Sequence, residues 1–210
     1  MFITFEGMEG CGKTTQVKRF AKRLKGEGIS LITTLEPGGT RIGGDIRKIL
    51  LDSRNKNLSP LTELILYAAD RAQHVEELIK PALDEGKWVI CDRFFDATVV
   101  YQGIARGQDM ELIGILNEEA TQGIQPDITF LLDCPVQMGL NRALERNEAQ
   151  SQKGQDRFER EALNFHRAVR EGYLELARKN QDRFVIIDTT LPKDEVEEKI
   201  FQHMETFLDE

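Results

Sequence analysis

The segment from Phe2 to Thr15 constrains the fold more than any other part of the chain. An apolar run leads into a glycine-rich turn, and the turn leads into Lys13-Thr14-Thr15 at the start of a helical pattern. This is the phosphate loop G-x-x-x-x-G-K-[ST], placed between a strand and a helix as that loop requires. Glycines let backbone N–H groups turn inward around a phosphate chain, and the helix N-terminus faces the same anion. The segment therefore predicts that the chain binds a nucleoside triphosphate.

Positions within the loop have distinct predicted contacts. Lys13 is placed to reach the β- and γ-phosphates, and the Thr14 hydroxyl to ligate Mg²⁺. Arg142, further along the chain, is hypothesised to stack on the adenine. The predicted nucleotide-binding residues are Gly7, Met8, Glu9, Gly10, Cys11, Gly12, Lys13, Thr14, Thr15 and Arg142.

Length and charge exclude several classes of protein. With 210 residues, the chain fits one domain with a sizeable core, and we expect residues 1–210 to form it. A net charge of −8 argues against a nucleic-acid surface. No apolar run approaches the ~18 residues of a membrane span, and the start of the chain has no export signal. We expect a cytoplasmic protein with neither nucleic acid nor membrane as a partner.

Short apolar runs alternate with longer helical patterns, which is typical of βαβ units and a parallel sheet. The predicted strands are Phe2–Glu6, Ser30–Thr34, Trp88–Cys91, Ile128–Leu132 and Phe184–Ile187. The predicted helices are about Lys13–Glu27, Ser59/Pro60–Leu83, Glu111–Gln122, Pro135–Arg146, Arg157–Lys179 and Lys193–Phe207. Ser59 and Pro60 suit the cap and the first turn of the long helix. The polar segment Asn147–Gln155 predicts a surface loop, of a length that suits a lid.

Arginines that follow the phosphate loop narrow its use, because the loop alone leaves kinases, GTPases and motor ATPases open. Arg71 lies four residues after Tyr67 in a predicted helix, hence on the same face. Asp92 and Arg93 follow a strand directly, at the carboxyl end where parallel sheets bind ligands. Three more arginines flank the polar segment: Arg142, Arg146 and Arg157. Such a set suits phosphoryl transfer between two phosphorylated molecules, which requires mainly positioning and charge neutralisation.

These and further motifs occur in the order seen in one family. The chain resembles the thymidylate kinases, of the nucleoside monophosphate kinase group, over nearly its whole length. The matching blocks are Phe5–Thr15, Glu36–Thr40, Tyr67–Arg71, Asp92–Phe94, Thr98, Tyr101–Gly103, Pro126-Asp127, Leu132-Asp133 and Asp156–Glu159. The resemblance implies a P-loop kinase fold of the α/β class. In this fold, helices flank a five-stranded parallel sheet of order 2-3-1-4-5, with a lid at about 146–158.

The resemblance also implies an activity and an assembly. The expected reaction is ATP + dTMP ⇌ ADP + dTDP with Mg²⁺, in dTTP synthesis, and the expected assembly is a homodimer. Glu9 matches a carboxylate that holds the 3′-hydroxyl of dTMP. Arg71 and Arg93 match residues that grip its 5′-phosphate, for which a planar guanidinium fork is suited. Arg93 is also expected close to the transferred group.

Other positions match contacts to the thymidine part and to the metal. Tyr67 matches the ring that stacks on thymine, and Thr98 and Gln102 match positions at the base edge. Tyr101 matches a ring that crowds the 2′ side of the sugar and so favours deoxyribose. Asp92 resembles the acid near Mg²⁺, which it reaches through water.

In this family the cation that stabilises transfer comes from the phosphate loop or from the lid. The loop positions here, Met8 to Cys11, contain no base, so we expect the lid to supply it. The lid offers Arg146, Lys153 and Arg157, and we hypothesise that Arg146 and Arg157 close over the ATP phosphates. The predicted catalytic residues are therefore Lys13, Arg93, Arg146 and Arg157.

Three positions depart from the family pattern. Leu35 replaces an arginine, a charge that Arg41 or Arg47 can supply. Phe94 replaces a tyrosine, and Ala97 a serine. Two alternatives remain open. A deoxynucleoside kinase takes an uncharged acceptor, which the pair Arg71 and Arg93 disfavours; a nucleotide-dependent switch has no small acceptor at all.

Overall fold

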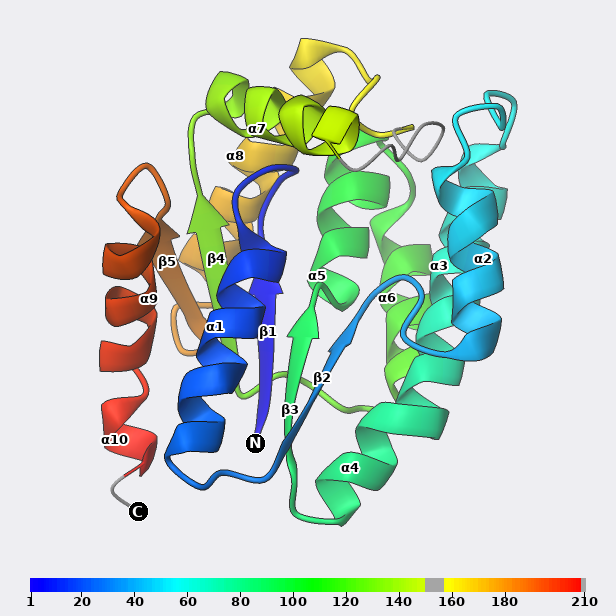
Figure 1. Ribbon diagram of the computed structural model, residues 1–210. Coiled ribbons are helices and arrows are strands. Elements are labelled where there is room, and N and C mark those ends of the chain that lie inside the picture. The colour runs from blue at the N-terminus through cyan, green and yellow to red at the C-terminus, as the bar shows by residue number, and fades with distance from the viewer. Residues whose placement is uncertain (150–156, 209–210) are drawn as a thin grey trace.

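Five parallel strands form the centre of the computed structural model, which describes residues 1–149 and 157–208 (Figure 1). They are β1 (Phe2–Glu6), β2 (Leu31–Leu35), β3 (Trp88–Asp92), β4 (Ile128–Asp133) and β5 (Phe184–Asp188), in the order β2-β3-β1-β4-β5. In the register, Ile3 of β1 lies opposite Ile90 of β3 and Ile128 of β4. The predicted strands and their order are confirmed, with bounds that differ by a residue at some ends.

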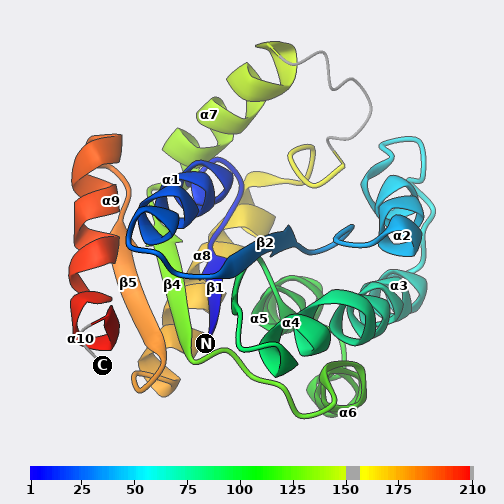
Figure 2. The same ribbon diagram turned by 60° about the horizontal axis from the view of Figure 1, so that its bottom comes forward.

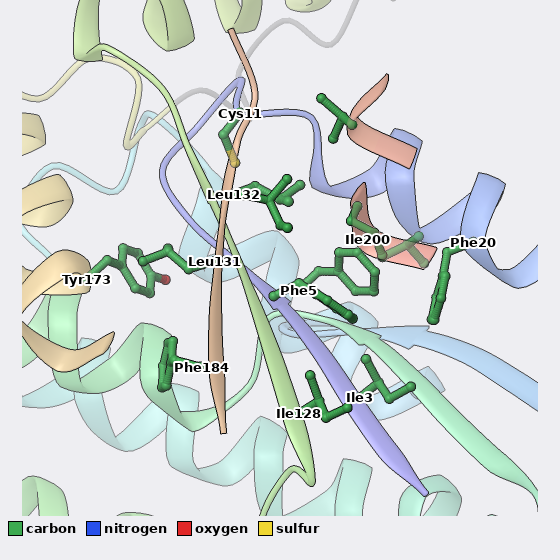
Figure 3. Packing of buried hydrophobic residues seen from close by; sticks show 14 of the residues in the cluster. Ile3, Phe5, Cys11, Phe20, Ile128, Leu131, Leu132, Tyr173, Phe184 and Ile200 are labelled. Atoms are coloured by element: carbon green, nitrogen blue, oxygen red, sulfur yellow. The ribbon is translucent and has the colours of Figure 1, made fainter. Parts of the chain in front are cut away.

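Strand β1 is buried along its whole length because helices cover both faces of the sheet. Successive side chains of a strand point to opposite faces. The Phe5 ring packs on Phe20 of α1 (Lys13–Gly26), with ring centroids 5.6 Å apart. The next residue, Glu6, points the other way and accepts a hydrogen bond from Tyr173 of α8 (Leu163–Lys179). Figure 3 shows Phe5 and Phe20 on one side of the strands and Tyr173 on the other.

Helices surround the sheet. Besides α1 and α8, they are α2 (Arg41–Leu51), α3 (Pro60–His74), α4 (Lys80–Asp84), α5 (Phe95–Thr98), α6 (Met110–Thr121), α7 (Val136–Ala149), α9 (Lys193–Gln202) and α10 (Glu205–Leu208). Helices α1 and α9 lie next to each other, and α2, α3 and α6 are grouped at one side (Figure 2). Two π-helical segments, η1 (Val75–Ile79) and η2 (Val99–Ala105), follow α3 and α5. Among the described residues, no helix combines the length and the apolar character needed to cross a membrane.

The predicted helix from Ser59/Pro60 is confirmed as α3, η1 and α4 in succession. Its cap is also as predicted, since the Ser59 hydroxyl accepts a hydrogen bond from the Thr62 N–H. Helix α2 was not predicted from the sequence because Gly43 and Gly44 lower its intrinsic helix propensity.

Two boundaries near the predicted lid were wrong. Helix α7 continues to Ala149 and so enters the segment predicted as a loop, while α8 begins at Leu163 rather than at Arg157. Residues 150–156, which hold most of the predicted lid and Lys153, lie outside the described residues.

The carboxyl ends of all strands meet at one edge of the sheet, as they must in a parallel sheet. The loop after β1, the start of α1 and the residues after β3 lie at this edge, and α7 passes across it (Figure 1). The fold therefore gathers the motifs that the sequence carries at separate positions.

Candidate active site

Backbone geometry explains the glycines of the loop that joins β1 to α1. Gly7 and Gly10 have φ values of 133° and 70°, in the left-handed region that favours glycine. A Cβ atom on Gly10 would lie 1.8 Å from the carbonyl oxygen of Gly139 in α7. The loop therefore passes under α7 with no room for a side chain. Gly12 precedes α1, whose first N–H groups have no side-chain cap, so they remain available to an anion.

Lys13 folds back into this loop. Its Nζ atom donates hydrogen bonds to the carbonyl oxygens of Gly7, at 3.0 Å, and Met8, at 2.9 Å. The ammonium group is thus held inside the turn, beside the N–H groups that are suited to an anion. This is the arrangement expected for a phosphate-binding lysine.

A cleft of about 1060 Å³ opens at the carboxyl edge of the sheet. The predicted residues that line it are Glu9, Gly10, Cys11, Gly12, Lys13, Thr14, Thr15, Tyr67, Arg71, Asp92, Arg93, Thr98, Tyr101, Gln102, Arg142 and Arg146. Gly7, Met8 and Arg157 do not line it. The structure therefore brings the phosphate loop and both acceptor-side arginines, Arg71 and Arg93, to one cavity.

Thr14 and Asp92 form a pair of oxygen ligands suited to a hard cation. The Thr14 hydroxyl, at the start of α1, donates a hydrogen bond of 2.6 Å to Asp92 Oδ2 at the end of β3. Within the described residues, no group of three or more His, Cys, Asp or Glu side chains is placed to hold a metal. Mg²⁺ usually takes only one or two protein ligands and fills its shell with water and substrate phosphates. The pair fits that mode of binding.

Arg93 occupies a strained backbone position at the centre of the site. Its φ of 74° lies in the left-handed region, which costs a non-glycine residue on the order of 1–3 kcal/mol. The following N–H, of Phe94, donates a 2.7 Å hydrogen bond to Glu6 Oε1. The guanidinium group donates to Tyr173 (3.0 Å), Tyr101 (3.1 Å) and Glu9 Oε1 (3.2 Å). The buried groups of Glu6, Tyr101 and Tyr173, together with Glu9, thus fix both the backbone and the side chain of Arg93.

The two carboxylates of this network have opposite pKa shifts. Burial raises the pKa of Glu6 to about 7, although Arg93 acts in the lowering direction. Burial also raises the pKa of Glu9, but His166, Arg93 and Lys13 together outweigh it and lower the pKa to about 2. Glu9 therefore remains an anion at neutral pH, whereas Glu6 titrates near it.

Arg71 is fully buried, and hydrogen bonds fix the orientation of its guanidinium group. Its Nε donates to Glu36 Oε2 at 3.0 Å, and its two terminal nitrogens donate to Asn117 Oδ1 at 2.8 Å and Thr98 Oγ1 at 3.0 Å. His74 binds the other oxygen of Glu36 at 2.9 Å. The guanidinium group therefore reaches the cleft in one orientation, with its charge balanced by a buried carboxylate.

The resemblance implies an arginine where this chain has Leu35, and Arg47 is placed to supply that charge. Arg47 extends from α2 into the cleft and donates a 2.7 Å hydrogen bond to the Pro37 carbonyl oxygen. Burial lowers the pKa of Arg47. Arg41, at the start of α2, is largely exposed and pairs with Asp45 instead. Of the two residues predicted to supply the charge, only Arg47 lines the cavity.

The arginines on the lid side lie in different places. Arg146 lines the cleft and pairs with Glu159 at 3.2 Å, and Arg142 donates to the Thr189 carbonyl oxygen at 3.1 Å. Arg157 does not line the cleft. Its guanidinium group lies 2.6 Å from Glu63 Oε2 and donates to the Leu50 carbonyl oxygen, which ties it to α3 and α2.

The residues predicted to bind the thymidine part differ in the hydrogen bonds that their side chains make. Tyr67 lies in the cleft wall. The Gln102 side-chain amide donates a 2.8 Å hydrogen bond to Glu63, and the Tyr101 hydroxyl donates a 2.6 Å hydrogen bond to Glu9 Oε1. The structure therefore connects Tyr101 directly to the carboxylate of the phosphate loop.

Four residues of the network were not predicted as site residues: Glu6, Glu36, His166 and Tyr173. The sequence holds two indications of such a role. Glu6 is a charged residue at the end of an otherwise apolar strand, where an unpaired carboxylate would be costly. His166 and Tyr173 are seven residues apart and so share one face of a helix. Which polar groups they meet depends on the packing of α8 against η2, β4 and β5, and no local pattern records that.

Known proteins give consistent matches. The model of the thymidylate kinase family matches residues 5–200. A thymidylate kinase of Desulfosudis oleivorans is 54% identical over 210 residues, which cover all of this chain and 98% of that protein. A second, from Geotalea uraniireducens, is 53% identical over 95% of this chain and 93% of its own length. A solved thymidylate kinase from Ehrlichia chaffeensis is 33% identical, with a TM-score of 0.78 over 98% of each chain.

Replacing Glu6 with Gln should change how stability depends on pH. The folded carboxyl group releases its proton near pH 7, against an ordinary pKa of 4.5. Between these values the folded state holds more protons than the unfolded state, so the free energy of unfolding falls as pH rises through this window. The expected fall is on the order of 3 kcal/mol, and Glu6→Gln should remove it.

Urea unfolding at pH 4.5 and pH 7.5 measures the difference. Glu111→Gln, at an exposed position of α6, serves as the control and should keep the pH dependence of the parent. If Glu6→Gln keeps it as well, the carboxyl group does not titrate in this window.

Proposed function

This chain belongs to the thymidylate kinase family, and we propose that it transfers the γ-phosphoryl group of ATP to dTMP, with Mg²⁺, as a step of dTTP synthesis. One observation carries the proposal. The phosphate loop with Lys13 and two fixed arginines, Arg71 and Arg93, line a single cleft. A donor triphosphate and an acceptor phosphate bound there would meet with their charges opposed by separate sets of cations.

The acceptor end is built for an anion. Arg71 pairs with the buried Glu36, and Arg93 pairs with Glu9 and has the buried Glu6 at 4.0 Å. An uncharged nucleoside would give these guanidinium groups nothing to bind, which disfavours a deoxynucleoside kinase. A switch without a small acceptor would not need two fixed arginines beside the phosphate loop. We therefore place the 5′-phosphate of dTMP between Arg71 and Arg93.

Transfer then follows from positioning and charge. A 5′-phosphate oxygen of dTMP attacks the γ-phosphorus of ATP, the bond from that phosphorus to the bridging oxygen breaks, and ADP leaves. Lys13, Arg93, Arg146 and Arg157 stabilise the negative charge on the group in transit, for which Arg157 has to leave Glu63. Thr14, and Asp92 through water, would hold Mg²⁺, which neutralises the β- and γ-phosphates when bound.

The thymidine part is assigned to the opposite wall of the cleft. Tyr67 stacks on the base, and Thr98 and Gln102 lie at its edge. Glu9 holds the 3′-hydroxyl, and the ring of Tyr101 crowds the 2′ position. The contact between Tyr101 and Glu9 supports this assignment, because one sugar would meet both at once.

We also propose a homodimer packed through α3 and α6. These helices lie side by side, and each leaves large apolar residues exposed. Leu61 and Ile65 are 51% and 49% exposed on α3, and Leu112 and Ile115 are 36% and 56% exposed on α6. Exposed large apolar residues on two neighbouring helices are typical of an interface between subunits. A cytoplasmic location belongs to the same proposal, and activity in the membrane fraction of a cell lysate would oppose it.

A panel of acceptors tests the activity. With ATP and Mg²⁺, dTMP should give the fastest formation of ADP, compared with dUMP, dCMP, AMP, UMP and thymidine. Faster turnover of thymidine than of dTMP would instead identify a deoxynucleoside kinase. Binding of ATP without ADP formation from any acceptor would identify a switch.

A substitution of Arg93 tests the acceptor site. Arg93→Lys should lower kcat/KM for dTMP by about 10²-fold or more, because a point charge replaces a bidentate fork.

Substitutions on the lid side test the two proposed transfer cations. Arg146→Ala and Arg157→Ala should each lower kcat by about 10²-fold, with the KM for dTMP little changed, because the lost contact forms only in the transition state. For Arg157 this requires the guanidinium group to leave Glu63 during the reaction. Arg54→Ala, at an exposed position, is the control. Whichever arginine variant keeps a near-normal kcat is excluded from the role.

Sedimentation equilibrium tests the dimer. Ile65→Asp places a charge in the apolar surface of α3 and should shift the protein to monomers. Ile186→Asp alters an equally exposed isoleucine of β5, away from that surface, and should leave the assembly unchanged. A parent protein that sediments as a monomer at micromolar concentration would rule the interface out.

A further inference from the structure

His166 is a fully buried histidine whose polar atoms lack hydrogen bonds. Within the described part of the chain, neither ring nitrogen has a hydrogen-bond partner. The other fully buried histidine, His74, binds Glu36 through one nitrogen and Thr34 through the other. Burying an unpaired polar group costs free energy. An apolar residue at position 166 would avoid that cost, so packing alone does not account for the imidazole.

Glu9, which lies next to His166, also has a buried polar atom without a hydrogen bond in the part of the chain that the structure describes. The Nδ1 atom of His166 lies 3.6 Å from Glu9 Oε2, which is buried and has no hydrogen bond within the described residues. This distance is just longer than a hydrogen bond. A small movement of either side chain would therefore satisfy both atoms.

The two oxygens of Glu9 face different groups. Oε1 accepts hydrogen bonds from Tyr101 and Arg93 on the acceptor side of the cleft, and Oε2 faces His166 on α8. An acceptor phosphate would compete with Glu9 for Arg93. Tyr101 would still donate to Oε1, and His166 is placed to hold the second oxygen, Oε2.

We propose that His166 is a positioning residue that holds Glu9 through Oε2, so that Oε1 is presented to the 3′-hydroxyl of the acceptor. His166 would thereby set the preference for acceptors that carry this hydroxyl. The inference rests on the role of Glu9 in the proposed function. The charge state of Glu9 is compatible with it: burial raises the pKa of this carboxyl, but His166 and Arg93 lower it to about 2.

The test compares dTMP with 3′-deoxy-dTMP as acceptors, as the ratio of their kcat/KM values. In His166→Leu, which removes the polar atoms, this ratio should fall by about tenfold or more, since a hydrogen bond to a charged group is lost. His166→Gln keeps an N–H donor and should restore part of the ratio. Val169→Ala, at a buried position one turn along α8, should keep the ratio of the parent. The KM for ATP should stay unchanged in all of these variants.

Glu9→Gln separates this inference from the proposal beneath it. It should lower the ratio, and adding His166→Leu should lower it no further, because both act through one contact. If Glu9→Gln leaves the ratio unchanged, the assignment of Glu9 to the 3′-hydroxyl fails. If Glu9→Gln lowers the ratio and His166→Leu does not, only the role of His166 is overturned. Loss in His166→Leu that the Gln variant does not recover, with equal loss in Val169→Ala, would mean that His166 only supports packing.

Discussion

A buried charge network around Arg93 determines the form of this site. A guanidinium group in a protein interior is stable only where anions and acceptors surround it. Glu9 supplies an anion at 3.2 Å, the Glu6 carboxyl group lies 4.0 Å away, and the hydroxyls of Tyr101 and Tyr173 supply the acceptors. The same contacts hold the left-handed backbone of Arg93 at the end of β3. Because these partners come from the phosphate loop, η2 and α8, the network fixes three elements relative to the sheet.

The parallel sheet explains how residues distant in the sequence come to line one cleft. Its carboxyl edge places the turn after β1 beside the residues after β3, which brings Thr14 to Asp92 and Glu9 to Arg93. Arg71 reaches the same cleft from α3, and its charge is balanced by Glu36 beyond β2. Arg71 and Arg93 thus each lie beside a separate buried carboxyl group. A site with this preorganised charge can bind an anion with little rearrangement.

The sequence predicted features that depend on local pattern, and it failed where packing decides. The strands, their order and the phosphate loop follow from apolar runs, glycine spacing and family motifs, and the residues chosen from those motifs mostly line one cleft. Helix α2 was missed because two glycines mask a helix that the Thr40 cap and the packing on α3 stabilise. The pairing of Arg157 with Glu63 of α3 was likewise not predicted, because it depends on how the chain packs; the role of Arg157 at the phosphates stays a proposal. The positions of Glu6 and His166 in the network could not be predicted, because their partners are distant in the sequence.

The central claim is that donor and acceptor phosphates meet in one cleft between Lys13 and Arg93. The most direct test is inhibition by adenosine and thymidine joined through their 5′ positions by five phosphates, a molecule that spans both sites only if they adjoin. The account predicts inhibition competitive with ATP and also with dTMP, and binding weakened by Arg93→Lys. Inhibition competitive with only one substrate would contradict it.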